Sequence, residues 1–283
     1  MALTIKKQDS VSSILMFVFN VFLVEQDITS IPLRKILQVF QPFKKSETSI
    51  RMGLSRAVQY GILRNVRIEN EVYYQLTDEG TAALVEWQET MTSFQRNIAL
   101  QLGGWNGFWS LVVIDEGSSG GSSNSESLVA LLDSLKYGRP GRNLWISPYD
   151  RSQVLLNHLN DNADKIPKVL VFQAQAIAGI SNQELAQRAW DIQTLSQKYK
   201  QFVDELRRDT AGLQKHLTGE MILPFLHIHG LKLFDIMRQD PQLPLEVLPE
   251  DWPGLKAAQE FMTVRETVLP VARVYLDSIL AEQ

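Results

Sequence analysis

The residues best suited to chemistry lie on one side of a single predicted helix between residues 46 and 60. At 100° per residue, this side carries no acid and collects five polar side chains and one flexible apolar one: Thr48, Arg51, Met52, Ser55, Arg56 and Gln59. Arginine pairs bidentately with guanine, glutamine pairs with adenine, and hydroxyl groups bind phosphates or bases. The opposite side holds Ile50, Leu54, Ala57 and Val58, which favours packing on other helices. The pattern predicts a helix that reads base edges in a major groove; a basic surface helix is the alternative.

A compact block of positive charge surrounds this helix. From residue 34 to residue 67 the chain has eight basic residues and one acid, Glu47, whereas the net charge of the whole chain is −4. A basic block on an acidic chain indicates a local site for a polyanion, although a solvated basic face would look the same. Four of its members flank the helix and are predicted to contact DNA: Lys44, Lys45, Arg64 and Arg67.

The first 80 residues must position this helix, and their pattern indicates three helices followed by a hairpin. The helices are predicted over residues 11–25, from near 30 to 42, and from 46 to 61. Pro32 suits the first turn of the second helix, and Ser46 suits the N-cap of the third. Strands predicted over 62–68 and 72–76 are joined by the acidic turn Glu69-Asn70-Glu71, which we expect to stay clear of DNA. This order is typical of a winged helix-turn-helix.

The rest of the chain indicates an α+β protein with further domains. We predict four parts: a winged-helix DNA-binding domain (1–80), a connecting helix (81–104), a central α+β, ferredoxin-like domain (105–178) and a C-terminal helical domain (179–283). The Gly/Ser-rich loop 117–123 is left out of this prediction, because such composition is flexible. A capping box at Ser181–Glu184 is predicted to open a helix that continues to about residue 209.

The central part alternates predicted strands and helices. The strands are predicted at 108–114, 144–147 and 168–174 and the helices at 127–137 and 151–159. The segment Gly138-Arg139-Pro140-Gly141 is predicted to be a turn.

Composition excludes several classes of function. Cysteine is absent from the 283 residues, which excludes disulfides, thiolate metal sites and cysteine nucleophiles. The most apolar stretch, residues 14–24, is shorter than the ~20 residues of a membrane span, and no signal-peptide cleavage site follows it. No Gly-rich phosphate loop, Ser-His-Asp signature or dinucleotide fingerprint is present. We therefore expect a cytoplasmic protein that is not an enzyme and has no cofactor, no metal and no membrane contact.

Two other groups of residues invite a chemical interpretation. His227 and His229 would point ~160° apart on a helix, so they do not form a helical pair of metal ligands. Asp115 and Glu116 end a predicted central strand, where ferredoxin-like nucleases place metal-binding acids. Without further clustered acids we interpret them as a polar loop edge, and a metal-dependent nuclease stays a remote alternative.

Four motifs give the chain a resemblance to the PaaX family of transcriptional regulators, typified by the repressor of phenylacetic acid degradation. They are the predicted reading helix 50–58 with the wing segment 73–77, the tryptophan-rich segments 105–109 and 144–148, the segment 186–191, and the proline-rich segment 238–254. The last, which reads Asp-Pro-Gln-Leu-Pro and then Leu-Pro-Glu-Asp-Trp-Pro-Gly, is the most specific. The resemblance covers residues 10–265.

The resemblance implies a homodimeric, ligand-responsive repressor that binds double-stranded DNA at a palindromic operator and leaves it when an aryl- or acyl-coenzyme A thioester binds. The candidate effector contacts are Arg139, Arg142, Trp145, Trp190 and Trp252. Arginine suits the phosphates of coenzyme A, but a solvated turn is the alternative for both arginines. A purely structural loop is the alternative for Trp252. A protein-interaction adaptor that keeps a winged-helix fold is the alternative for the whole chain, because the wing tip is acidic.

Overall fold

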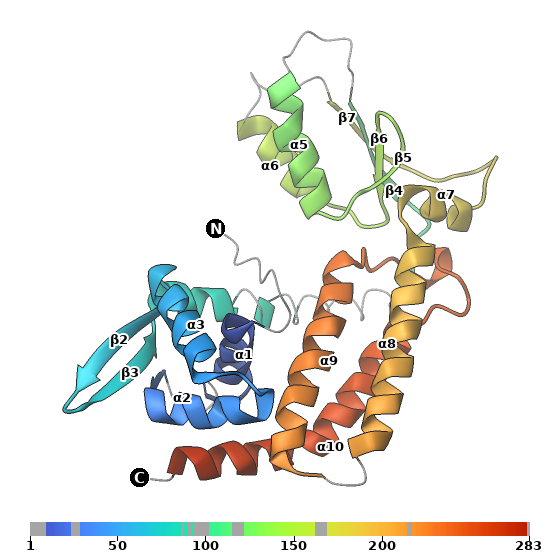
Figure 1. Ribbon diagram of the computed structural model, residues 1–283. Helices are drawn as coiled ribbons and strands as arrows, with labels where there is room; N and C mark the ends of the chain where they lie inside the picture. The colour runs from blue at the N-terminus through green and yellow to red at the C-terminus, as the bar shows by residue number, and fades with distance from the viewer. Residues whose placement is uncertain are drawn as a thin grey trace. The chain divides into compact units, whose positions relative to one another are not determined.

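A computed structural model of the chain describes residues 10–23, 29–85, 88–89, 92, 102–114, 122–161, 169–213 and 217–281. In these ranges the protein is mixed α+β, as predicted, with two small antiparallel sheets (Figure 1). Across the same ranges, no helix is both long and apolar enough to span a bilayer. The predicted connecting helix 81–104, the Gly/Ser loop 117–123, Asp115 and Glu116 lie mostly or wholly outside them.

The N-terminal elements include the three predicted helices and the hairpin, with a short strand before the second helix. They are α1 (Val11–Val18) continued by the π-helix η1 (Phe19–Leu23), β1 (Ser30–Pro32), α2 (Leu33–Phe40), the 3-10 helix η3 (Gln41–Phe43), α3 (Glu47–Gln59), β2 (Leu63–Ile68) and β3 (Glu71–Leu76). The three strands form one sheet in the order β1-β3-β2. Its apolar residues pack with those of the helices, so that Ile31, Ile36 and Leu54 are fully buried.

One prediction for this region is wrong. The second helix was expected to begin near Ser30, but residues 30–32 form the strand β1, which pairs antiparallel with β3. Pro32 has extended backbone angles and stands just before α2. Proline has no N–H group to donate, so sheets place it on edge strands. Pro32 therefore suits the last position of an edge strand as well as the start of a helix.

The second sheet is built from β4 (Trp109–Ile114), β5 (Gly138–Gly141), β6 (Leu144–Ser147) and β7 (Val169–Ala174), in the order β5-β6-β4-β7. Helix α5 (Ser122–Ser134) connects β4 to β5, and α6 (Ser152–Asp161) connects β6 to β7. The predicted turn at 138–141 is wrong, because this segment forms the edge strand β5 and pairs with β6 across an irregular register. Its backbone hydrogen bonds thus go to a neighbouring strand.

Each face of this sheet has its own apolar cluster. On one face Val112, Trp145 and Leu155 belong to a cluster with residues of α5. On the other face Trp109 and Ile146 pack with the segments after β7 and after residue 240. The alternation of side chains along β4 and β6 produces this division.

The C-terminal region is helical: α7 (Asn182–Ala189), α8 (Ile192–Leu213), α9 (Gly219–Gln239), the 3-10 helix η4 (Leu245–Val247) and α10 (Gly254–Ala281). The capping box is confirmed: the Ser181 hydroxyl accepts from the Glu184 amide, and the Glu184 carboxylate accepts from the Ser181 amide. The single long helix predicted after it is wrong, because the chain is extended at Trp190 and restarts as α8. Asp191 begins α8 by accepting a hydrogen bond from the Thr194 amide at 3.1 Å.

The described residues group into two compact units that do not follow chain order. The first unit takes its residues from Met1–Ser93, Tyr199–Met237 and Gly254–Gln283. The second takes them from Phe94–Lys198 and Arg238–Pro253. The N-terminal elements therefore share a unit with most of α8, α9 and α10, and the proline-rich segment shares a unit with the central sheet.

Candidate nucleic-acid interface and ligand pocket

Helix α3, which carries the predicted reading face, has well-defined ends. The Ser46 hydroxyl accepts a hydrogen bond from the Ser49 amide at 3.2 Å, which confirms the predicted N-cap. Before it, Lys44 closes η3 in the left-handed region at φ 52°. Beyond the other end, Gly61 has φ 73°, a conformation that glycine adopts at no steric cost.

The two sides of α3 have the predicted environments. All six residues of the predicted reading face are exposed: Thr48, Arg51, Met52, Ser55, Arg56 and Gln59. On the other side Ile50, Leu54 and Ala57 are buried, and Val58 is half-buried. Gly53 lets α3 approach α1 closely, because a Cβ added there would lie 2.4 Å from Cβ of Val11.

One feature of the reading face was missed. No acid was predicted there, but Glu47 in the first turn of α3 reaches Arg51. The Arg51 Nε and one terminal nitrogen donate to Glu47 Oε1 at 2.8 and 2.6 Å. The i, i+4 spacing could have indicated this pair. Both side chains are half exposed, so the pair contributes little stability, but it fixes one edge of the guanidinium.

The hairpin places further basic groups beside α3. Arg64 and Arg67 lie on β2 and are exposed, and Arg64 donates to the Gln75 side chain across the hairpin at 3.0 Å. At the tip, Glu71 forms an ion pair with Arg34 at 2.8 Å, so one of the two tip acids is neutralised by a residue of α2. Lys44 is exposed, and Lys45 is half-buried.

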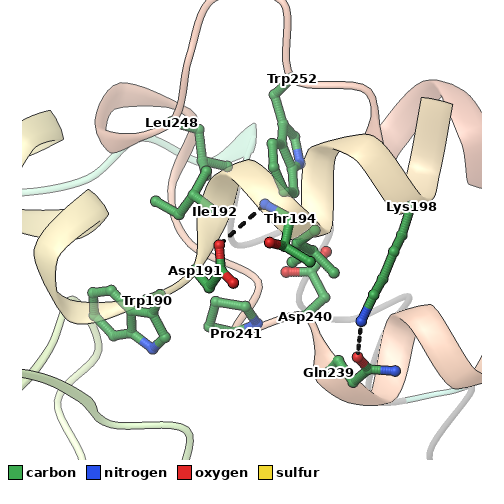
Figure 2. Close-up of a pocket in the computed structure, with 11 residues that line it drawn as sticks. Trp190, Asp191, Ile192, Thr194, Lys198, Gln239, Asp240, Pro241, Leu248 and Trp252 are labelled. Atoms are coloured by element: carbon green, nitrogen blue, oxygen red, sulfur yellow. Dashed lines mark hydrogen bonds between the residues drawn. The ribbon is translucent and has the colours of Figure 1, made fainter.

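A pocket of about 210 Å³ opens in the second unit, between the start of α8 and the proline-rich segment (Figure 2). Apolar walls come mainly from two indole rings and four aliphatic side chains: Trp190, Trp252, Ile192, Leu195, Pro241 and Leu248. Polar groups are Asp191, Thr194, Lys198, Gln239 and Asp240. Lys198 donates to the Gln239 side chain at 2.5 Å, as Figure 2 shows.

Hydrogen bonds hold the polar groups of the pocket in place. The hydroxyl and the amide of Thr194 donate to Asp191 and keep the pKa of its carboxyl below the ordinary value. Asp240 is buried and accepts from the Gln242 amide at 2.6 Å. Outside the pocket lining, the Tyr149 hydroxyl donates to the Gln242 carbonyl, and burial raises the pKa of Tyr149 to about 12.

The five predicted effector contacts do not converge. Trp190 and Trp252 line the pocket, whereas Arg139, Arg142 and Trp145 do not. Trp145 is buried in the cluster on the other face of the sheet. The Arg139 guanidinium stacks 4.7 Å from the Trp145 ring centroid and donates from Nε to the Arg142 carbonyl at 3.0 Å, so its bonds are local to the β5–β6 hairpin. Of the polar lining residues that were not predicted, Gln239 lies inside the proline-rich motif 238–254, whereas Lys198 had no sequence signal.

The two histidines of α9, which were not expected to be a helical pair of metal ligands, are core residues. His227 is buried, with its Nε2 2.9 Å from the Ser13 hydroxyl. His229 is buried, and its Nε2 lies 2.9 Å from a carboxylate oxygen of Asp209. Within the described ranges, no three His, Cys, Asp or Glu side chains gather as a potential metal site.

The structural class is thus an α+β protein that carries a candidate nucleic-acid-reading helix in one compact unit and an aromatic pocket in the other. Two family models match the chain: that of PaaX-like proteins over residues 12–80 and that of the PaaX-like protein C-terminal domain over residues 190–278. Together they match more than half of the chain, which belongs to the PaaX family. The predicted resemblance is confirmed.

Two individual proteins are similar to this chain. The transcriptional repressor PaaX of Escherichia coli (strain K12) is 25% identical over 238 residues, which are 81% of this chain and 72% of the repressor. An uncharacterized protein of Mycobacterium tuberculosis, Rv0674, has a solved structure that superposes with a TM-score of 0.60. It is 20% identical, and the match covers 95% of this chain and 99% of that one, so it supports the fold alone.

Proposed function

We propose that this protein is a sequence-specific, DNA-binding transcriptional repressor of the cytoplasm. One observation carries the proposal: α3 exposes a row of side chains that can pair with base edges while its other side is buried. Membership of the PaaX family and the similarity to the Escherichia coli repressor support it. Arg51, Arg56 and Gln59 would read bases. Phosphates would be contacted by the flanking basic residues: Lys44, Lys45, Arg64 and Arg67.

The architecture that we propose has a winged helix-turn-helix as its reading part. Helices α2 and α3 would be the helix-turn-helix, and the hairpin of β2 and β3 would be the wing. The second sheet would be ferredoxin-like, because its strands and helices alternate as βαββαβ. Strand β6 lies between β5 and β4, and β7 lies at the other side of β4. The proposed parts are those predicted from the sequence: the winged-helix domain (1–80), the connecting helix (81–104), the ferredoxin-like domain (105–178) and the C-terminal helical domain (179–283).

We further propose that the repressor is a homodimer. An exposed apolar strip on the sheet supports self-association: Leu170 and Phe172 on edge strand β7 are about half exposed, and they lie in register with Val113 and Leu111 of β4. Exposed apolar patches mark interaction surfaces. Two reading helices related by a dimer axis would address half-sites of a palindrome about one helical turn, ~34 Å, or a multiple apart.

A small-molecule effector would bind in the pocket of Trp190 and Trp252. Indole rings and aliphatic side chains suit an aryl or acyl group. The pocket of about 210 Å³ is smaller than the ~300–1,000 Å³ of sites that enclose drug-sized ligands. If the effector is an acyl-coenzyme A thioester, the pocket would therefore take its acyl group, and the nucleotide would stay outside.

Selection of bound DNA from a random library at moderate salt tests the proposal. An enriched inverted repeat is the expected result. No enrichment, with weak and salt-sensitive binding only, would reject a DNA-reading role. A stable protein partner recovered with this protein in a pull-down would then favour the alternative of a protein-interaction adaptor. The ion pair between Arg34 and Glu71 weakens the argument for that alternative, because it neutralises part of the acidic tip.

A further inference from the structure

Two buried polar contacts fasten the reading part of the molecule to its C-terminal helices. We call described residues 10–85 the head; they share the first compact unit with most of α9 and all of α10. One contact joins α2 to the last turn of α10, and the other joins α1 to α9. Figure 1 shows α2 beside the C-terminal part of α10, and α1 beside α9.

The first contact uses a lysine at a position where charge is costly. Lys35 on α2 is only 3% exposed, and its Nζ donates to the carbonyl of Ile279, two residues before Ala281, the last described residue of α10. Carbonyl groups in the last turn of a helix have no intrahelical partner, and the helix dipole favours a cation there. Burying an ammonium group is unfavourable unless it is paired. The carbonyl at the end of α10 therefore suits the buried ammonium group of Lys35.

The second contact lies elsewhere on the head. The hydroxyl of Ser13, on α1, lies 2.9 Å from Nε2 of His227, and both residues are 1% exposed. Phe17 and Phe43 pack edge-on against the His227 ring, with centroids 5.3 and 5.6 Å away. The imidazole therefore contacts the head from α1 and from the turn between α2 and α3.

Apolar contacts alone allow one element to slide or rotate on another, because the hydrophobic effect is non-directional. Buried polar pairs are directional, and in other systems they specify register at some cost in stability. Two such pairs at separate points restrict both sliding and rotation of the head on α9 and α10. We propose that Lys35, with the Ser13–His227 pair, holds the reading helix at a fixed orientation and so sets which half-site spacing the dimer accepts.

This inference rests on the proposed function as a dimeric DNA reader. One base pair added between half-sites moves the second by ~3.4 Å and turns it by roughly a tenth of a helical turn. A rigidly held head cannot move to the shifted half-site, so the DNA must be deformed. A loosened head can move to the shifted half-site. The preference for one spacing should therefore weaken, while an intact α3 still reads each half-site.

The test measures affinity for the selected inverted repeat and for versions with one base pair added or removed in the spacer. Full-length protein is used as wild type, Lys35→Met and Ser13→Ala. For wild type, we expect each spacer change to lower the affinity roughly ten-fold or more, the scale of imposed DNA deformation. For Lys35→Met the loss should shrink to less than about three-fold, with the preference over scrambled half-sites retained. Ser13→Ala should show a smaller change in the same direction.

Lys35→Met is expected to fold, because methionine resembles the lysine stem in length and its side chain carries no charge that is costly to bury. Ser13→Ala serves if it does not. Lys256→Met, which removes an exposed charge from α10, is the matched control and should keep the wild-type spacing penalty. If both folded variants keep the full penalty, or if wild type accepts all spacings equally, the inference is wrong. If wild type selects no DNA at all, the proposed function has failed first.

Discussion

The reading face of α3 and the pocket of Trp190 and Trp252 are built in opposite ways. The face consists of side chains that one short helix presents to solvent, and each is positioned by the same backbone. The pocket is assembled from the start of α8, the end of α9 and the proline-rich segment, with residues more than 40 positions apart bonded to each other, such as Lys198 and Gln239. A surface that contacts a polyanion can be built from neighbouring residues of one helix. A pocket that encloses a small apolar ligand needs walls from several segments of the chain.

Substitution of two glycines by alanine should produce the largest losses of stability. It should also show that the α3 face and the pocket can be disturbed independently. A Cβ at Gly53 would lie 2.4 Å from Val11, and a Cβ at Gly138 would lie 2.4 Å from the Trp190 ring. Gly53→Ala should force α3 away from α1 and weaken DNA binding. Gly138→Ala should disturb a wall of the pocket and leave DNA binding unchanged. Overpacking of this kind lowers the free energy of unfolding by about 1–3 kcal/mol, which denaturant titration measures.

Gly212→Ala is the control for both substitutions, because the added Cβ meets nothing within 4 Å. In a helix it should be neutral or raise the free energy of unfolding by up to about 1 kcal/mol. Equal loss of DNA binding in Gly53→Ala and Gly138→Ala would contradict the separation of the two regions.

Within the reading face, Arg51→Ala and Lys44→Ala should differ in kind. Loss of Arg51 should relax the preference for one base position by about 1–3 kcal/mol, because a bidentate contact to guanine is lost. Loss of Lys44 should weaken binding to all DNA alike and reduce the salt dependence by about one phosphate contact. Titrations of the selected site and of single-base variants at several salt concentrations measure both. A uniform loss on every sequence for both variants would remove the division of roles.

Glu47→Gln tests the acid that sequence analysis did not expect on this face. Removing a negative charge should strengthen non-specific binding slightly, because phosphates are repelled less. It should also release the edge of Arg51 that Glu47 holds, and so lower the preference at the base that Arg51 reads by less than the loss in Arg51→Ala. An increase that is equal for specific and scrambled DNA would show that Glu47 is only a surface charge.

The smallest expected effect is a pH dependence of the first unit. Burial lowers the pKa of His229, against the opposing effect of Asp209 and Glu205, while Lys232 lowers it further. The pKa of His229 in the folded state is below the unfolded value of about 6.5. The contribution of the neutral imidazole to the free energy of unfolding is therefore complete above pH 6.5 and is lost as the pH falls below it. Denaturation midpoints of wild type and His229→Gln between pH 7.5 and 5.5 should converge as the pH falls. Parallel curves would be inconsistent with a buried neutral imidazole.

The features that sequence predicted are those set by local periodicity or local hydrogen bonding. The buried and exposed sides of α3, the N-cap at Ser46 and the capping box at Ser181 all follow from residues within one or two turns of each other. The strands β4, β6 and β7 were found because apolar runs bounded by turn residues are typical of buried strands.

The features that sequence missed depend on partners far along the chain. Residues 30–32 and 138–141 are strands only because β3 and β6 offer them an edge, so their own composition favoured a helix start and a turn. Lys35 is buried because the end of α10, 244 positions away, supplies a carbonyl. Three of the predicted effector residues, Trp145, Trp190 and Trp252, come from the family motifs, whereas Arg139 and Arg142 were chosen because arginine suits phosphates. The pleat of the sheet sends Trp145 to the face opposite the pocket.

The central claim is that α3 reads a specific DNA sequence, and a direct titration tests it. The affinity of the full-length protein for the selected inverted repeat is compared with its affinity for a scrambled duplex of the same length, at physiological salt. We predict a ratio of ~10³ or more, as for specific DNA-binding proteins, and its loss in Arg51→Ala. Equal affinity for the two duplexes would contradict the account, because the exposed row on α3 would then bind only as a basic surface.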